Sequence, residues 1–279
     1  EYTHYVPFPI ETVQNFLKNT VDRWMQDFMR RCQHIIIPSE SMRDTLVNEY
    51  GLKNNFTVIP TGIDIETYRT ASGEKIRKKQ HWEKDIVMVT IGRLASEKNW
   101  PTLIHAAALV IKDFPGDGPD RKSLEDLVKE LGIQKRVTFT GSLSFSETPS
   151  YMKAANLFGF ASVTETQGLA TLEAMAAGLP VVAVDASGTR DILKHGQQGY
   201  LVENNAEALA AGIKKLLSNP ERMQKFAQAA SKKAQSFNIE HLTERLLNVY
   251  EQAIRDKKKN RFVTVNPPSP ASADPLPQA

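Results

Sequence analysis

The sequence predicts an α/β protein built on a doubly wound parallel sheet. Short apolar runs that can form buried strands alternate with segments of strong helix formers. The clearest run covers residues 86–91, and further runs cover 157–161 and 181–184. Each run is followed by a polar turn that contains glycine and then by a helical segment. Because strand, short loop and helix recur in this order, neighbouring strands are expected to be parallel.

The composition is that of a globular protein, and it argues against several kinds of partner. Hydrophobic residues make up 41% of the 279 residues and charged residues 24%, which is ordinary for a chain with a sizeable core. A net charge of +3, from 35 basic and 32 acidic residues, is too small to indicate nucleic-acid binding. The single cysteine, Cys32, excludes an intramolecular disulfide and a cysteine-rich metal site. No apolar run reaches the length of a membrane span and no secretory signal is recognisable, so the sequence predicts a cytoplasmic protein.

Residues 1–64 carry their own strands and helices but are too few for a complete sheet domain, so they are expected to be the last third of one. The expected elements are a helix over 10–32, a strand over 34–39, a helix over 40–50 capped by Ser39, a strand over 56–60 and a turn over 61–64. The first helix is amphipathic, with Trp24 and Phe28 on its apolar face. It can pack against a sheet, which we favour, or lie on a membrane surface.

The rest of the chain is expected to form a second sheet domain over 65–236, a helix over 237–256 that packs back toward the N-terminal part, and a disordered tail over 257–279. Residues 70–85 are expected to be a linker that leads into a helix, with the basic run 77–79 as a solvated face. The expected helices cover 100–114, 121–131, 148–155, 169–177, 189–193, 206–218, 221–234 and 239–255, and the remaining strands cover 137–141 and 199–202.

One irregularity interrupts the alternation. The helix over 100–114 runs into Pro-Gly-Asp-Gly-Pro at 115–119, and the next helix begins near residue 120. A strand is needed between two such helices. We therefore expect that a strand and its lead-in, on the order of ten residues, are missing from this sequence before Gly116.

Two cations follow the strand over 86–91. Arg93 comes directly after Gly92, and Lys98 lies before the next helix. Ligands of open α/β sheets bind at the carboxyl ends of the strands. An arginine can grip a phosphate with two hydrogen bonds, and a lysine adds a second positive charge. The alternative is an ordinary surface pair, but this position in the chain favours a phosphate site.

Residues 165–178 form the stretch around which the rest is arranged. They follow a buried strand with a polar turn, Gly168 and a helix, so that main-chain N–H groups and the positive end of a helix point at the ligand. Glu165 and Glu173 bracket this turn. A carboxylate suits the hydroxyl pair of a sugar, so a ligand with a diphosphate and sugars at both ends, a nucleotide sugar, fits all these features. Taken alone, the two carboxylates could equally be solvated residues.

Several motifs occur together and in order. They are Gly-Arg-Leu-Ala-Ser-Glu-Lys from residue 92, Gly-Asp-Gly-Pro from 116, the stretch 165–178, Gly-Leu-Pro-Val-Val-Ala-Val-Asp-Ala-Ser-Gly from 178 and Gly-Tyr-Leu-Val from 199. This set resembles the family 4 retaining glycosyltransferases of GT-B architecture. The stretches from residues 4, 59 and 165 are most similar to bacterial diacylglycerol glucosyltransferases. The resemblance implies a GT-B fold, with a Rossmann-like C-terminal domain and the C-terminal part of an incomplete N-terminal Rossmann-like domain.

The resemblance also implies roles for individual residues. The residues that it marks for nucleotide-sugar binding are Gly92, Arg93, Lys98, Gly118, Gly168, Leu169 and Glu173, and the catalytic ones are Arg93, Lys98 and Glu165. In the family, the two cations hold the diphosphate and stabilise the departing UDP. The first carboxylate contacts the donor hexose, the N–H groups at the start of the helix face the phosphates, and the second carboxylate binds the ribose. No metal or other cofactor is expected. The sugar is thought to be transferred by front-face attack, so Glu165 is not assigned as a nucleophile.

The implied function is transfer of a hexose, most simply glucose, from a UDP-sugar to a lipid acceptor such as diacylglycerol at the inner face of the cell membrane. Two alternatives stay open: a soluble sugar or phosphoinositol acceptor, and a non-catalytic nucleotide-sugar-binding subunit. A glycosidase is not favoured, because a phosphate-type turn follows Glu165. Most of the first GT-B domain, with the family's catalytic histidine, is not found in this sequence, and His4 is not assigned to that role. The chain by itself is therefore expected to be an inactive fragment.

Overall fold

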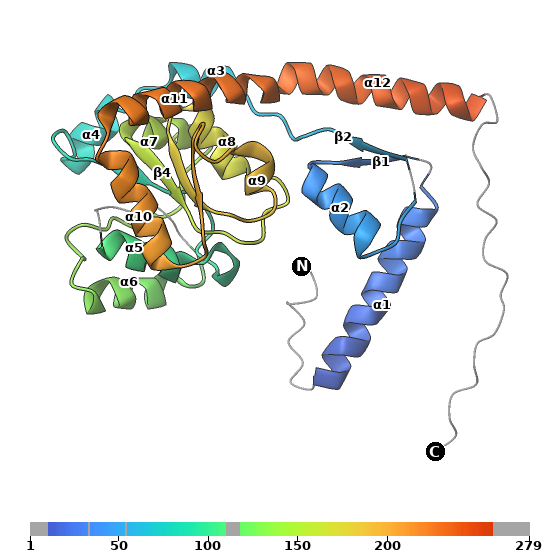
Figure 1. Ribbon diagram of the computed structural model, residues 1–279, viewed down its shortest axis with the longest axis horizontal. Coiled ribbons are helices and arrows are strands. Elements are labelled where there is room, and N and C mark those ends of the chain that lie inside the picture. Colours follow the sequence, from blue (N-terminus) through green and yellow to red (C-terminus); the bar gives the residue numbers. More distant parts are fainter. Residues whose placement is uncertain (1–10, 33, 54, 110–117, 259–279) are drawn as a thin grey trace. The chain divides into compact units, whose positions relative to one another are not determined.

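The computed structural model describes residues 11–32, 34–53, 55–109 and 118–258, and the chain folds into two units. The smaller unit combines the described residues of Glu1–Ile36, Asp44–Thr57 and Leu246–Ala279, and the larger combines Ile37–Arg43 with the described residues of Val58–Arg245. Each unit therefore takes residues from separate parts of the chain (Figure 1). All predicted site residues belong to the larger unit. The predicted domain boundaries stay predictions.

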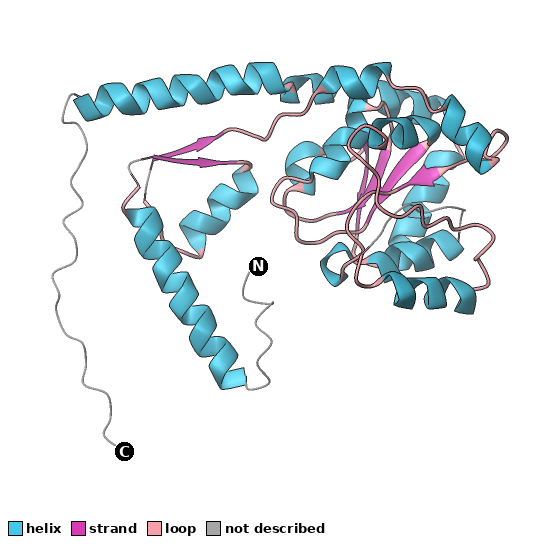
Figure 2. Cartoon of the chain, turned by 180° about the vertical axis from the view of Figure 1, so that it is seen from behind, coloured by secondary structure: helices cyan, strands magenta, loops and turns pink. Residues whose placement is uncertain are grey.

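The larger unit is built on a parallel sheet of four strands. The strands are β3 (Met88–Val89), β4 (Leu157–Phe160), β5 (Val181–Val184) and β6 (Gly199–Val202), and they lie side by side in that order. Every neighbouring pair is parallel, with Phe158 opposite Val181 and Val181 opposite Gly199. Figure 2 shows this sheet in magenta among its helices. The predicted α/β class with a parallel sheet is confirmed.

Helices connect these strands and cover the sheet. They are α3 (Ile65–Thr70), α4 (Glu74–Gln80), α5 (Trp100–Ala108), α6 (Arg121–Glu130), α7 (Thr148–Ala154), α8 (Leu169–Ala176), α9 (Thr189–Ile192), α10 (Ala206–Leu217) and α11 (Pro220–Ala234), with 3₁₀ turns η2 (Ser96–Lys98) and η3 (Gln235–Phe237). Val182 and Val184 share a buried core with α5, α6 and α10. Helix α8 contacts β4 and β5, and its buried Leu172 and Met175 lie outside that core. The sheet is thus covered by helices on both faces, which explains why its strands are apolar throughout.

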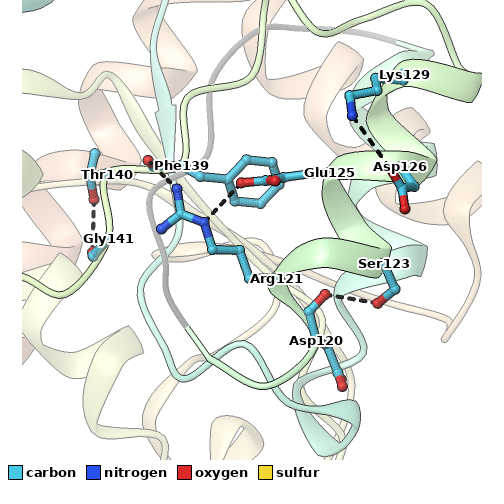
Figure 3. A network of polar contacts seen from close by, with 9 residues as sticks. All are labelled: Asp120, Arg121, Ser123, Glu125, Asp126, Lys129, Phe139, Thr140 and Gly141. Atoms are coloured by element: carbon cyan, nitrogen blue, oxygen red, sulfur yellow. Dashed lines mark hydrogen bonds and ion pairs between the residues drawn. The ribbon is translucent and has the colours of Figure 1, made fainter.

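The predicted strand over 137–141 is wrong, because this segment joins neither of the two sheets that the described residues form. Val137 is buried and Phe139 packs against the core, which explains the alternating apolar pattern. Arg121 of α6 contacts this segment instead of a neighbouring strand. Its Nη2 donates to the Phe139 carbonyl at 3.4 Å, and its guanidinium lies 6.0 Å from the centroid of the Phe139 ring (Figure 3). The Thr140 hydroxyl also bonds locally, to the Gly141 carbonyl. The apolar alternation at 137–141 therefore results from packing against α6 and not from pairing in a sheet.

The predicted strand over 86–91 is shorter than expected, because within the described part of the chain only Met88–Val89 pairs with a neighbour. Ile86 is 51% exposed, and the Val87 N–H donates to the Asn156 side chain at 2.8 Å. The end of the predicted helix over 100–114, and the missing strand expected before Gly116, lie in 110–117 and so outside the described residues.

The segment predicted as a linker over 70–85 contains the helix α4, and one residue of its basic run is not simply solvated. Arg77 Nη1 donates to the carbonyls of Trp82 at 2.8 Å and Asp85 at 3.2 Å, and Nη2 donates to Asn156 Oδ1 at 2.7 Å. The guanidinium thereby ties the turn after α4 to the start of β4. Lys78, in contrast, forms an exposed ion pair with Glu74 at 2.8 Å.

Replacing Arg77 with alanine is expected to lower the free energy of unfolding by about 1–3 kcal/mol, because it leaves partly buried acceptors without their donor. Lys79→Ala is the matched control from the same basic run, since Lys79 is exposed, and it should change the stability by less than about 0.5 kcal/mol. Urea unfolding of both variants measures the difference. Equal stability of the two would mean that Arg77 is a surface charge after all.

The smaller unit contains α1 (Glu11–Arg30) and most of a two-stranded sheet of β1 (His34–Ile37) and β2 (Asn55–Val58). It also contains parts of α2 (Glu40–Asn48) and α12 (Ile239–Lys258). The predicted helix over 10–32 is confirmed over the residues of α1. Its apolar face is exposed in part: Trp24 is 67% and Phe28 57% exposed, and their rings stack at 6.2 Å. Whether this helix packs on a sheet or lies on a membrane stays a prediction.

Helix α12 extends two residues past the predicted start of the tail. Lys257 and Lys258 belong to α12, whereas the tail was expected to begin at residue 257. Lysine is a good helix former and its charge is favourable at the C-terminal end of a helix. The rest of the predicted tail, from residue 259, lies outside the described residues.

Candidate functional site

A cavity of about 340 Å³ lies in the larger unit where the chain leaves β3 and β4. Its wall combines Gly92, Arg93 and Lys98 after β3 with residues 165–170 after β4, and adds Pro38 and Thr61 from the earlier part of the chain. The carboxyl ends of parallel strands meet at one edge of a sheet, which is where ligands of such sheets bind. The predicted cations, Glu165, Gly168 and Leu169 are therefore brought to one place.

Lys98 and Glu165 form an ion pair in this cavity. Lys98 Nζ lies 2.5 Å from Glu165 Oε1, and the two side chains are 22% and 14% exposed. Lys98 is the last residue of η2, and Asn99 after it adopts a left-handed conformation with φ of 53° that turns the chain into α5. A lysine ammonium has three N–H donors, so Lys98 can bind Glu165 and a second anion at the same time.

Arg93 stands at the mouth of the same cavity. Its side chain is 66% exposed, and its Nη2 lies 2.6 Å from Glu97 Oε1. Its carbonyl accepts a hydrogen bond from the Trp100 indole Nε1 at 2.8 Å, and Trp100 is buried. The main chain of Arg93 is thus fixed by the core while its side chain faces solvent, a suitable arrangement for binding an anion that enters from outside.

The N-terminus of α8 forms one wall of the cavity. Gly168 is its N-cap with φ of 75°, a left-handed conformation that favours glycine, and no side chain caps the helix there. Leu169 and Ala170 in the first turn also line the cavity. Uncapped N–H groups and the positive end of the helix can bind a phosphate. The expected turn with an uncapped helix start is therefore present, and anion binding by Gly168 and Leu169 stays a prediction.

Glu173 does not line this cavity. It lies partly buried on α8 and hydrogen-bonds the hydroxyl of Tyr68, a buried residue of α3. Burial raises the pKa of Glu173, and the Tyr68 hydroxyl lowers it in part. Burial and the carboxylate in turn raise the pKa of Tyr68. The reading of Glu173 as a plain solvated residue is wrong, whereas its role in ribose binding stays a prediction.

Gly118 also lies outside the lining of this cavity. A side chain there would meet the main chain of Leu94, because a Cβ at Gly118 would come within 2.4 Å of the Leu94 carbonyl oxygen. The Asp120 N–H donates to that same carbonyl at 3.0 Å. Glycine is thus required here by close packing of two loops, whatever its role in nucleotide binding.

Gln167 is a residue that sequence reasoning missed. It is 4% exposed, and its side-chain amide pairs with the main chain of Thr61: Oε1 accepts from the Thr61 N–H at 2.6 Å, and Nε2 donates to the Thr61 carbonyl at 2.9 Å. The position of Gln167 between Glu165 and Gly168 could have indicated a role in the site, but no sequence feature near it identifies Thr61 as its partner. The amide fixes the loop on which Glu165 stands.

Two further contacts hold the same loop. The Ser39 hydroxyl donates to the Thr166 carbonyl at 2.7 Å and accepts from the Met42 N–H at 3.2 Å, so that Ser39 caps α2 as predicted and also binds the loop. Gly188 packs so closely that a Cβ there would come within 2.2 Å of the Glu165 carbonyl oxygen. The loop at 165–167 is therefore contacted by three separate segments of the larger unit, at Ser39, Thr61 and Gly188.

Gln167→Ala is expected to lower the free energy of unfolding by about 1–3 kcal/mol, because the Thr61 N–H and carbonyl lose their partner in a partly buried place. It should also weaken nucleotide binding, since the loop that carries Glu165 is released. Gln224→Ala on the exposed side of α11 is the control. Thermal unfolding together with UDP titration measures both effects, and an unchanged melting temperature would show that the loop does not depend on this amide.

No group of three or more histidine, cysteine, aspartate or glutamate side chains that could hold a metal ion occurs among the described residues. None of the described helices is long and apolar enough to cross a membrane.

Comparison with known proteins assigns the chain to a family. Residues 72–233 match the family of glycosyl transferases group 1, and residues 2–67 match glycosyltransferase family 4. The chain is 30% identical over 269 residues to alpha-monoglucosyldiacylglycerol synthase of Streptococcus pneumoniae, covering 91% of this chain and 59% of that protein. It is 29% identical to D-inositol 3-phosphate glycosyltransferase of Rhodococcus jostii, covering 82% of this chain and 54% of that protein. The chain thus spans between half and three fifths of the length of these relatives.

The fold is shared with solved structures. The chain is similar to the Anabaena protein Alr3699/HepE in complex with UDP and glucose, with a TM-score of 0.78 and 25% identity over 84% of this chain and 67% of that one. The predicted GT-B fold class is confirmed by such neighbours together with the parallel α/β sheet. On these matches, the chain belongs to the group 1 glycosyltransferases, with an N-terminal segment of glycosyltransferase family 4.

Proposed function

We propose that this protein transfers a hexose, glucose in the simplest case, from a UDP-sugar to a lipid acceptor such as diacylglycerol, with retention at the anomeric carbon. The observation that carries the proposal is the cavity at the N-terminus of α8, where Lys98, Glu165 and an uncapped helix end are combined. Two charges of opposite sign beside a phosphate-type turn suit a ligand that carries both a diphosphate and a sugar. UDP and glucose in the Anabaena relative support the choice of donor.

The chain's own residues can supply electrostatic catalysis. When the bond from the anomeric carbon to the diphosphate breaks, the departing UDP oxygen takes the electron pair and gains negative charge. Lys98, Arg93 and the N–H groups at the start of α8 would stabilise that charge, each from a position fixed by the fold. Glu165 would accept hydrogen bonds from hydroxyls of the hexose and so orient it. The new bond forms from the acceptor hydroxyl to the same face of the anomeric carbon, and the hydroxyl proton leaves with the departing phosphate.

The acceptor is proposed from the relatives. The Streptococcus relative is named as a monoglucosyldiacylglycerol synthase, and the exposed aromatic face of α1 in the smaller unit suits an enzyme that works beside a lipid surface. The protein would then act as a peripheral protein at the inner face of the membrane. D-inositol 3-phosphate is the second candidate acceptor, favoured by the Rhodococcus relative. No metal or other cofactor enters the proposal.

A transfer assay with radiolabelled UDP-glucose separates the candidates. Because the chain alone is expected to be inactive, the assay uses the full-length protein that contains it. This protein is offered diacylglycerol in mixed micelles, D-inositol 3-phosphate in solution, or both, and the label is followed into the organic or the aqueous phase. Label in the lipid phase that disappears in Lys98→Ala supports the proposal, and an α-configured product on NMR supports retention. Label found on D-inositol 3-phosphate would show that this compound, and not the lipid, is the acceptor. UDP binding without any transfer would indicate a nucleotide-sugar-binding subunit, and no UDP binding by a folded sample would overturn the donor assignment.

A further inference from the structure

A second hollow, of about 510 Å³, opens on the larger unit at the start of β6. Its residues come from the approach to β6, from the end of α10 and from the first turn of α11, among them His195, Tyr200, Lys215 and Arg222. In a parallel sheet all strands begin at one edge and end at the other. The first cavity is lined by residues that follow β3 and β4, so the two hollows lie at opposite edges of the same sheet.

The second hollow is cationic. Lys215, Arg222 and Lys225 are basic side chains, and Glu221 is the one carboxylate among the described residues that line it. Gathered charges of one sign repel each other and oppose the compact state. A bound anion would relieve this repulsion.

The central arginine of this hollow is held in place. Arg222 Nη1 donates to the Tyr200 hydroxyl at 3.1 Å, and Tyr200 is only 5% exposed because its ring packs edge-on against Phe226 at 5.3 Å between centroids. Lys215 Nζ lies 4.7 Å from the centroid of the same tyrosine ring. A guanidinium has five N–H donors, so the bond to Tyr200 orients the group and leaves donors for a ligand.

The turn that presents these cations is also fixed. The Asn219 side chain accepts from the Arg222 N–H at 2.8 Å, and Pro220 begins α11, which sets where the helix starts. The His195 ring is held by Nδ1 to the main chain of Leu201 and lies 5.5 Å from the Tyr200 ring. The cations thus stand on two helices joined by a short capped turn, so little order would have to be gained on binding.

We propose that this hollow is a second anion site that binds a phosphate group, with Arg222, Lys215 and Lys225 as its ligands. A carboxylate has two oxygens and is satisfied by one guanidinium, whereas a phosphate offers three or four oxygens and up to two negative charges, which suits three cations around one hollow. The phosphate can belong to a soluble compound or to the headgroup of an anionic lipid. Because the site lies at the other edge of the sheet, it does not depend on the donor assignment.

Two variants of equal charge test the site. Lys215→Gln with Lys225→Gln removes two cations of the hollow, and Lys214→Gln with Lys232→Gln removes two exposed lysines of the same two helices that do not line it. Inorganic phosphate is titrated into the deuterated, ¹⁵N-labelled full chain while amide shifts are followed. The Gly196 amide reports on this hollow and the Gly168 amide on the cavity at α8. The same proteins are sedimented with phosphatidylglycerol and with phosphatidylcholine vesicles.

We expect a saturable shift of Gly196 in the wild type and in the control, with at least tenfold weaker binding in the variant that lacks Lys215 and Lys225. Selective loss of binding to phosphatidylglycerol vesicles in that variant would identify the lipid headgroup as the source of the phosphate. Equal vesicle binding of both variants, with the phosphate difference retained, would identify a soluble ligand. Shifts at Gly168 alone, equal weakening in both variants, or binding of neither probe would overturn the proposal.

Discussion

Lys98→Ala is expected to reduce the turnover number about 100–1,000-fold, because it removes one preorganised donor from the place where charge develops on the departing diphosphate. The loss in UDP affinity should be smaller, about 1–3 kcal/mol for one charged hydrogen bond. Glu165 adds to the effect, since the same substitution leaves a carboxylate that is 14% exposed without its cation. Single-turnover kinetics with UDP-glucose, together with calorimetry with UDP, measures the two quantities separately.

Arg93→Ala is the companion variant for this prediction. Arg93 is 66% exposed and pairs with Glu97, so it should lose about 1–3 kcal/mol of UDP affinity with less effect on turnover. An unchanged turnover number in Lys98→Ala would show that Lys98 is not a catalytic residue. Unchanged UDP affinity in both variants would contradict the assignment of the cavity as the diphosphate site.

Glu173→Gln is expected to have two opposite effects: it should stabilise the fold and weaken nucleotide binding. The carboxyl is partly buried on α8, and burial raises its pKa above the ordinary value. The folded state therefore binds the proton more tightly than the unfolded state, and this group's contribution to stability is lost as the pH rises through the window between the two pKa values. At neutral pH the ionised Glu173 opposes folding, and glutamine, which can still accept from the Tyr68 hydroxyl, removes that cost.

The expected gain near pH 7 is about 0.5–2 kcal/mol, the usual size for a stabilising change at a functional position. It should shrink below about pH 4, where the carboxyl is protonated in both states. If Glu173 binds the ribose, UDP affinity should fall by about 1–3 kcal/mol, whereas the affinity for 2′,3′-dideoxy-UDP should hardly change. Melting curves from pH 3.5 to 8 and calorimetry with both nucleotides test the pair of effects. An equal loss for both nucleotides would contradict the ribose contact.

Tyr68→Phe provides a matched comparison. It removes the hydroxyl that hydrogen-bonds Glu173 while keeping the buried ring. The carboxylate would then be more costly to bury, so stability should fall by about 1 kcal/mol near neutral pH. The double variant with Glu173→Gln should recover part of this loss. No interaction between the two substitutions would show that the side chains act independently.

The parts of the site that depend on strand ends could be predicted from the sequence. Lys98 and Glu165 follow different strands, and the rule that parallel strands end at one edge was enough to expect them together. The α8 turn could be predicted because Gly168 follows a buried strand and precedes a run of helix formers. The alternating residues at 137–141 predicted a strand wrongly, since apolar alternation also arises when Phe139 packs beside Arg121 of a helix.

The contacts that hold the site residues in place could not be predicted in the same way. Gln167 pairs with Thr61, and Ser39 with the Thr166 carbonyl, so each partner is far away in the chain and leaves no periodic signal near the loop. The contact between Glu173 and Tyr68 is of the same kind, because it depends on how α3 packs against α8. A single sequence specifies elements through local patterns, whereas the pairing of their side chains appears only in three dimensions.

The pairing of Gln167 with Thr61 has a consequence for how the protein acquires its site. The two residues are 106 positions apart, and Ser39 and Thr166 are 127 positions apart. Contacts this distant in sequence form only after a large loop of chain has closed, and closing it costs conformational entropy. Such contacts therefore form late in folding. We expect the sheet to assemble first and the turn before α8 to become ordered last. In native-state hydrogen exchange the Thr61 amide would then open through small fluctuations, well below the free energy that protects the amides of β5, and the binding site would be the first part of the fold to be lost under mild denaturing conditions.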